Sequence, residues 1–129
     1  MATVDLSSYK KLYLQTAKQH SDVLSESYIK ISRNSLDKDA LKNMYISAHS
    51  LKSQSQAMGY VKIGALSGII EKIIKNILAD NTQVPNDLMA AIKDAIENVK
   101  LSLRNIQREN KEKDTDTITK KLEARYVSS

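Results

Sequence analysis

The sequence predicts an all-α fold: an antiparallel up-and-down four-helix bundle with a possible short fifth helix at the C-terminus. Apolar residues recur with the helical period in four long stretches. The chain has 3 glycines and 1 proline, too few for the turns of a many-stranded β-sandwich. Its length of 129 residues suits one domain. We therefore expect a single domain over residues 1–129, with its bundle core at about 5–109.

The first helix is expected from about Asp5 to Arg33, where an apolar residue returns every three or four positions. Asp5 suits an N-cap, because its carboxylate can accept hydrogen bonds from the free amides of the first turn. Asn34 and Ser35 break the pattern. The residues expected on the buried side are Leu6, Tyr9, Tyr13, Ala17, Leu24, Tyr28 and Ile31.

The second helix is expected to start near Asp37, again a capping residue, and to end before Gly59. Glycine adopts a positive φ at little cost, so Gly59 suits the residue that follows a helix C-terminus. The expected buried side of this helix comprises Leu41, Met44, Tyr45, Ala48, Leu51, Ser55 and Met58.

Two further helices complete the predicted bundle, from Val61 to Asp80 and from Asn86 to about Glu109. Apolar residues cover about half the circumference of the third helix, which makes it the most buried of the four. The loop Asn81–Pro85 separates the two helices.

A charged segment without apolar residues, at about 109–117, is expected to act as a linker. Residues 117–127 follow it and carry Ile118, Leu122 and Tyr126 at helical spacing. They could form a partly docked fifth helix.

The composition narrows the function classes. The chain has no cysteine, which excludes disulfides, thiolate metal sites and a cysteine nucleophile. No apolar run approaches the ~18 residues of a membrane-spanning helix, and the first residues lack the apolar stretch of a secretion signal. We expect a cytoplasmic protein that does not bind membranes and that has no metal site of its own.

The net charge of +5 raises the question of nucleic-acid binding. The basic residues, however, are spread along every expected helix and are interleaved with 15 acidic ones. A solvated surface of mixed charge explains this pattern better, so we expect no nucleic-acid partner. A modest basic bias also suits an acidic protein partner, because opposite potentials raise association rates.

The two histidines have different surroundings. His20 stands at helical spacing from apolar neighbours, as a half-buried histidine of a bundle does. His49 lies about 120° from the centre of the second helix's apolar stripe, at its solvent edge, with Lys52 one turn later. A neutral imidazole can attack through one ring nitrogen, and a nearby ammonium can stabilise the anionic oxygens that arrive there.

A partner for the other nitrogen of His49 is also predictable. His49 precedes the turn at Gly59 by about 15 Å of helix, and Glu71 follows it by about 18 Å. The two residues should therefore meet at similar height, and the small residues Gly64 and Gly68 let the helices approach closely. A carboxylate that accepts from Nδ1–H leaves Nε2 outward as a nucleophile. Spacing alone equally allows a plain surface histidine beside a solvated acid.

The run from Ala48 to Lys52, followed by the run from Ala57 to Tyr60, resembles the signature of histidine-containing phosphotransfer (Hpt) domains. It is most similar to those at the N-terminus of chemotaxis histidine kinases. The resemblance implies that His49 accepts a phosphoryl group on Nε2, that Lys52 lies near the phosphoryl oxygens and that Glu71 holds Nδ1. It covers roughly residues 5–109, and the last segment resembles the extra helix of the chemotaxis type.

One departure from the family concerns the residue after Lys52, which is usually glycine and here is Ser53, followed by Gln54. Serine is still small, so a docking protein should be tolerated, although partner choice or transfer rate could differ. The expected docking surface around His49 comprises Tyr45, Ser53, Gln54 and Gln56.

The sequence therefore predicts a monomeric histidine phosphocarrier of a two-component phosphorelay, which accepts a phosphoryl group on His49 and passes it to a receiver-domain aspartate. The chain has no glycine-rich phosphate loop, so we expect no enzyme with its own ATP site and no cofactor. The expected partners are a histidine kinase and receiver domains, which would supply Mg²⁺. The alternatives are the detached phosphorylation domain of a chemotaxis-type kinase and a non-catalytic helical adaptor or basic nucleic-acid-binding bundle.

Overall fold

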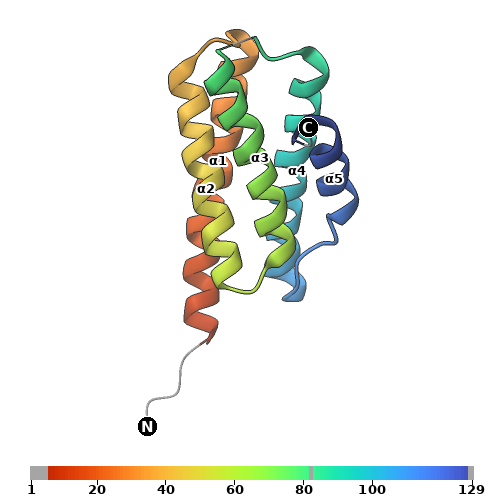
Figure 1. Cartoon of the computed structure of the whole chain (residues 1–129). Coiled ribbons are helices and arrows are strands. Elements are labelled where there is room, and N and C mark those ends of the chain that lie inside the picture. The colour runs from red at the N-terminus through yellow and green to blue at the C-terminus, as the bar shows by residue number, and fades with distance from the viewer. Residues whose placement is uncertain (1–5, 82, 128–129) are drawn as a thin grey trace.

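The four long helices pack side by side as an up-and-down bundle, and a short C-terminal helix lies against it (Figure 1). In this computed structural model, residues 6–81 and 83–127 are described. The helices of the bundle are α1 (Leu6–Arg33), α2 (Lys38–Ala57), α3 (Val61–Asp80) and α4 (Asn86–Glu109). The chain continues with α5 (Asp116–Leu122) and a π-helical segment, η1 (Glu123–Val127). The predicted all-α bundle is confirmed.

The helices follow one another around the bundle, so that α1 lies between α2 and α4, and α3 lies between α2 and α4 on the other side. Within the described residues, helices across the diagonal do not bring their backbones close together. The α2–α3 side and the α1–α4 side are therefore opposite faces of the molecule, which matters for the sites described below.

The turn between α2 and α3 sets the register of the two helices that carry His49 and Glu71. Gly59 has φ of 82°, as its predicted position after a helix C-terminus requires. The Tyr60 amide donates to the Ser55 carbonyl at 2.8 Å, and the Gly59 amide donates to the Gln56 carbonyl at 3.1 Å. These two bonds form a Schellman motif, which satisfies the last carbonyls of α2 and fixes the start of α3.

The start of α2 is also capped as predicted, because the Asp37 side chain accepts a 3.0 Å hydrogen bond from the Ala40 amide. The other predicted cap, Asp5, lies outside the described residues.

The core is aliphatic and is drawn from all four helices, with α3 supplying the longest run of buried residues. One expectation for α1 was wrong: Tyr9 was assigned to the buried side but is 56% exposed. Tyr13, one turn later, is buried, and its hydroxyl shares a 2.8 Å hydrogen bond with the Ser55 hydroxyl of α2. The aromatic side chain in the first turn of α1, that of Tyr9, therefore lies at the surface and not in the core.

The charged segment between α4 and α5 makes specific contacts with the bundle. The Glu112 side chain accepts a 2.9 Å hydrogen bond from the amide of Ile63, in the first turn of α3. The ammonium of Lys62 donates to Asp114 and to Asp116 at 3.2 and 2.8 Å. This loop therefore caps the N-terminus of α3, where unpaired amides favour a negative charge.

The C-terminal segment packs on the bundle through Leu122 and Thr119, which are buried. Near its end, Arg125 and the Tyr126 hydroxyl both donate to one oxygen of Asp87 at 3.0 Å. Within the described part of the chain, none of the helices combines the length and the hydrophobicity of a membrane span.

Candidate functional site

The site lies between α2 and α3, where a histidine, a lysine and a glutamate contact one another. His49 lies on the outward face of α2, and 55% of its side chain is exposed. Glu71 projects from α3 beneath it and is only 10% exposed. The Nδ1 atom of His49 forms a hydrogen bond with Glu71 Oε2. The contact expected from equal height along the two helices therefore forms, although Glu71 is more deeply buried than its position at the edge of the apolar arc indicated.

Lys52 completes the cluster from the same helix as His49. Its Nζ donates to Glu71 Oε1 at 2.7 Å, so that each carboxylate oxygen has one cationic or polar partner. Lys52 was expected only near the phosphoryl oxygens, so its ion pair with Glu71 was not predicted. The Lys52 side chain is 29% exposed and its ammonium has three donor hydrogens, so it can bind a second anion without releasing Glu71.

The ionisation of Glu71 determines which nitrogen of His49 carries the proton. Burial of Glu71 raises its pKa, but hydrogen bonds from Lys52 and His49 together outweigh burial, so that the pKa lies below its ordinary value of 4.5. The group is then an ionised carboxylate at neutral pH and can only accept hydrogen bonds. Nδ1 of the neutral imidazole must therefore donate, and the lone pair is on Nε2, which points away from Glu71.

Two glycines of α3 make room for side chains of α2. A Cβ atom on Gly68 would lie 3.1 Å from Cδ of Lys52, and one on Gly64 would lie 2.9 Å from Cγ of Gln56. The aliphatic part of Lys52 thus crosses α3 over Gly68 and reaches Glu71 one turn later. The sequence predicted the close approach of the helices but not that each glycine accommodates one particular side chain.

The four residues predicted as a docking surface do not share one face. Ser53 and Gln56 are exposed one and two turns from His49, and Tyr45 is half-buried against the core one turn before it. Gln54 lies about 140° around α2 from His49, and its Oε1 atom is buried without a hydrogen-bond partner among the described residues. It faces α1 instead of the surface beside His49.

An apolar groove that the sequence did not predict runs between α1 and α2. Gln54 lines it together with Ala57 and Met58 of α2 and with Tyr9 and Leu12 of α1. Leu12 is 61% exposed, and Ile46, one turn before His49, is 58% exposed. Exposed apolar side chains along a groove are typical of a protein-binding surface. The sequence did contain a sign of these exposed side chains, because α1 and α2 carry more apolar residues than one face of each helix can bury.

The second histidine, His20, is half-buried on α1, as predicted, and burial lowers its pKa. The described residues contain no group of three or more His, Asp or Glu side chains arranged to hold a metal ion.

Comparison with protein families finds the Hpt domain over residues 8–101. Among curated proteins, the chain is similar to the chemotaxis protein CheA of Bacillus subtilis, with 20% identity over 80% of this chain. It is also similar to the chemotaxis protein CheA of Halobacterium salinarum, with 22% identity over 79% of this chain. The chain spans 15% of the length of each of these relatives. No solved structure gives a significant match.

The matched region contains α2, α3 and all three residues of the cluster, and it covers well over half of the chain. The chain therefore belongs to the family of Hpt domains, which are modules of histidine phosphotransfer.

Proposed function

We propose that this protein is a histidine phosphocarrier, in which Nε2 of His49 accepts a phosphoryl group and passes it to a receiver-domain aspartate. The observation that carries the proposal is the hydrogen bond between His49 Nδ1 and the buried Glu71, because it aims the free Nε2 lone pair outward. A fixed orientation matters because the nucleophile must line up with the leaving oxygen.

In the transfer step, the Nε2 lone pair attacks phosphorus, a P–N bond forms, and the bond between phosphorus and the donor oxygen breaks. The donor aspartate leaves as a carboxylate, or ADP leaves if the donor is a kinase with bound ATP. The imidazole then carries a positive charge, which the ionised Glu71 stabilises through Nδ1–H. The reverse step delivers the phosphoryl group to the next aspartate.

Lys52 has two roles in this proposal. In the free protein its ammonium holds Glu71 and thereby the imidazole. After phosphorylation it lies one helical turn from His49, where its remaining donors can bind a phosphoryl oxygen. The Mg²⁺ ion that neutralises charge during transfer would be supplied by the partner protein.

The docking of the partner would use His49, Ser53 and Gln56 together with the α1–α2 groove near Leu12. Such a surface combines a polar reactive centre with an apolar border, as protein interfaces do. The hydroxyl of Ser53 stands one turn from His49 and leaves this surface low enough for a close partner.

A second candidate is favoured by the relatives that the chain matches. Both are chemotaxis proteins CheA, and the chain spans 15% of the length of each. In that case the domain is the phosphorylation module of a longer kinase, and a separate ATP-binding domain phosphorylates His49. The chemistry at the histidine is the same, and only the donor differs.

The test is phosphorylation by a phosphorylated receiver domain and, separately, by a chemotaxis kinase that lacks its own Hpt domain. Intact-mass measurement should show one added phosphoryl group that is labile in acid and stable in base. His49→Gln should abolish this labelling, whereas the matched control His20→Gln should keep it. Labelling that persists in His49→Gln would contradict the assignment, and the donor that works distinguishes the two candidates.

A further inference from the structure

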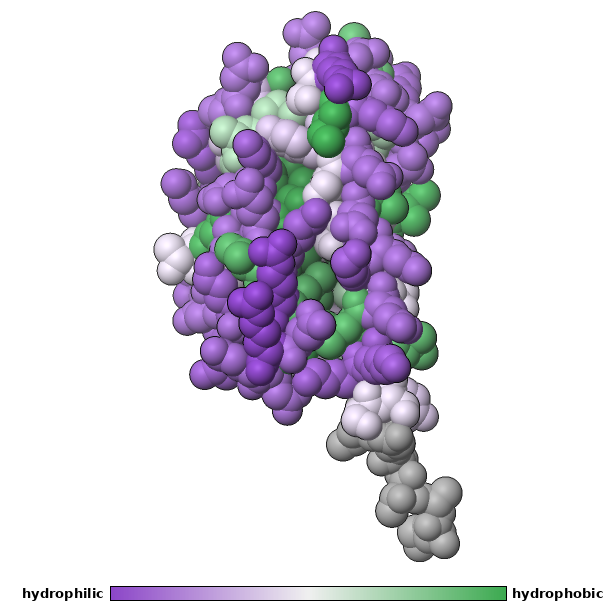
Figure 2. Space-filling model, turned by 180° about the vertical axis from the view of Figure 1, so that it is seen from behind, coloured by the Kyte–Doolittle hydropathy of each residue, from purple (hydrophilic) through white to green (hydrophobic). Residues whose placement is uncertain are grey.

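A second surface feature lies on the opposite face of the bundle from His49, between α1 and α4. Two adjoining hollows, of about 200 and 490 Å³, share Leu14, Lys18 and Gln107 and so form one continuous groove. Figure 2 views the molecule from behind and shows hydrophobic atoms in a furrow bordered by hydrophilic side chains. The groove is therefore separate from the phosphotransfer site.

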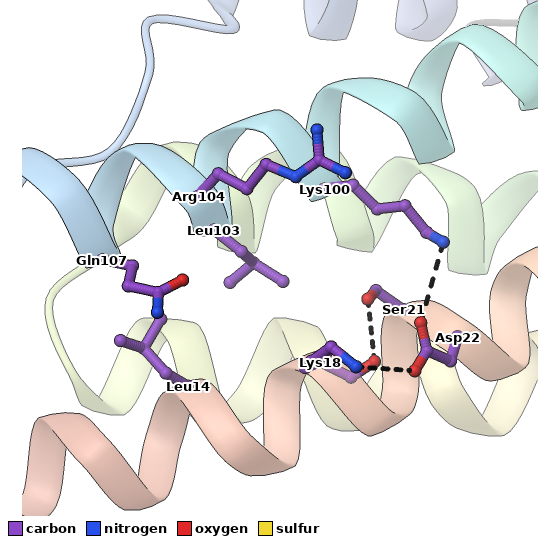
Figure 3. A pocket seen from close by; sticks show the side chains of 8 residues that line it. All are labelled: Leu14, Lys18, Ser21, Asp22, Lys100, Leu103, Arg104 and Gln107. Carbon is purple, nitrogen blue, oxygen red and sulfur yellow. Dashed lines mark hydrogen bonds and ion pairs between the residues drawn. The ribbon is translucent and has the colours of Figure 1, made fainter.

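The walls of the groove are strongly basic. Asp22 is the one acidic residue among those that line it, and Lys18 and Lys100 pair with it at 3.5 and 3.7 Å (Figure 3). Within the described part of the chain, Arg104 has no ion pair, and neither do Lys10 and Lys11. The basic residues that line the groove are Lys10, Lys11, Lys18, Lys100 and Arg104.

The floor of the groove is apolar, which distinguishes it from a simple anion site. Leu14 of α1 and Leu103 of α4 both project into the space between the two helices (Figure 3). A hydrated ion or a phosphate would neutralise the walls but would leave the half-buried Leu14 facing water, whereas Leu103 beneath it already belongs to the core. A ligand with carboxylates along its edges and apolar side chains on one face would satisfy both parts.

The shape of the groove also indicates the size of the ligand. The lining residues of α1 extend from Ser7 to Asp22, a distance of about 22 Å at 1.5 Å per residue. This is the length of about four turns of helix. Two antiparallel helices that leave an apolar furrow between them offer the groove into which a third helix packs.

We propose that the α1–α4 groove binds an acidic amphipathic helix of a partner protein. Apolar side chains of that helix cover Leu14, and its carboxylates face Arg104 and the lysines of α1. Because the groove and the His49–Glu71 pair are on opposite faces, the partner can stay bound while a receiver domain reaches the histidine. The groove then acts as an anchoring surface that is independent of phosphotransfer.

The test uses the full chain and a fluorescent acidic amphipathic peptide of about 18 residues, with leucines at i, i+3, i+4 and i+7 spacing and glutamates elsewhere. Fluorescence anisotropy measures its affinity, and amide NMR shifts locate its site. We expect shifts on α1 and α4, and an affinity that falls about tenfold in the double variant Lys11→Glu/Arg104→Glu. The matched control Lys75→Glu reverses an exposed lysine of α3 and should change the affinity less than about twofold.

Three other outcomes would overturn the proposal. Equal binding of a scrambled peptide with dispersed leucines would show that charge alone is recognised. Tighter binding of a single-stranded oligonucleotide or of phosphatidylserine vesicles, with the same sensitivity to the double variant, would assign the groove to nucleic acid or to membranes. Shifts confined to α2 and α3 would place the peptide elsewhere. Phosphorylation of His49 should be unchanged in the double variant. The peptide test and the phosphorylation test can therefore refute their two proposals independently.

Discussion

Two charged clusters are built on α3, and they differ in burial and in what they hold. At the middle of the helix, Glu71 is 10% exposed and pairs with Lys52 and His49 of the adjacent helix. At its N-terminus, Lys62 pairs with Asp114 and Asp116, which are 76% and 52% exposed. Both clusters contain similar hydrogen bonds, but in the first the carboxylate holds an imidazole.

The two clusters differ in burial, and we expect the buried one to serve the chemistry. A buried carboxylate costs desolvation energy, so its retention beneath an exposed imidazole indicates a function beyond stability. An exposed ion pair contributes little, because water and salt screen it. In the second cluster the more stabilising contact is the cap that Glu112 places on the Ile63 amide. The comparison predicts that substitutions at the first cluster affect phosphotransfer and those at the second affect stability.

The largest effect is expected at Glu71. Glu71→Ala should slow phosphorylation of His49 about 10- to 100-fold, because the ring loses its fixed orientation and tautomer. Glu71→Gln keeps the size of the side chain but not its charge, so its rate should lie between those of the wild type and Glu71→Ala. Rates are measured with a phosphorylated receiver domain in excess. If Glu71→Ala is phosphorylated as fast as the wild type, Glu71 has only a structural role.

A smaller effect is expected at Gly68, which accommodates the Lys52 side chain. Gly68→Ala should displace the ammonium and slow transfer several-fold. The added methyl group also favours the helix by about 0.5–1 kcal/mol, which offsets part of the steric cost in the folding free energy. If Gly68 acts through Lys52, the double variant Gly68→Ala/Lys52→Ala should be no slower than Lys52→Ala alone. Additive losses would show that Gly68 acts by another route.

The pH dependence of stability provides a third test of the buried cluster. Because the pKa of Glu71 is lowered in the folded protein, the carboxylate stabilises the fold above its ordinary pKa of 4.5. This stabilisation should be lost as the pH falls through the folded-state pKa. The unfolding free energies of wild type and Glu71→Gln, from urea denaturation, should therefore converge in acid. A constant difference between pH 7 and pH 3 would contradict the ionised pair.

The smallest effects are expected at the second cluster. Glu112→Ala should lower stability by about 1 kcal/mol, the usual contribution of a helix cap, and lower Tm by a few degrees. Lys62→Ala removes only exposed ion pairs, so it should lower the stability less than Glu112→Ala does. This loss should disappear at high salt, which screens the ion pairs in the wild type as well. Neither variant should change the phosphorylation rate of His49. A slower rate in Glu112→Ala would show that the two clusters are coupled through α3.

Much of the fold could be predicted because its signals are local. The ends of α3 and α4 follow from the change in apolar periodicity and from nearby Gly59 and Pro85, and the structure places them at the predicted residues. The contact between His49 and Glu71 was predictable from the constant rise of a helix and the position of one turn.

The rest depends on side-chain packing between segments that are distant in sequence. The ion pair of Lys52 with Glu71 requires its side chain to cross α3 over Gly68, which helical spacing does not reveal. Residues 109–117 carry only charge and turn signals, so their contacts with Lys62 could not be inferred. The basic groove is formed by cations of α1 and α4, which are dispersed in the sequence and meet only in the bundle.

We propose that the ring of His49 presents Nε2 to the partner while Glu71 holds Nδ1. The most direct measurement is heteronuclear NMR of the phosphorylated protein with ¹⁵N-labelled histidine, which identifies the nitrogen bonded to phosphorus. We predict that phosphorus couples to Nε2 of His49 and that Nδ1 keeps its hydrogen-bonded proton in the wild type but not in Glu71→Ala. Phosphorus bonded to Nδ1, or carried by any other residue, would contradict the assignment of Nε2 of His49 as the phosphorylated atom.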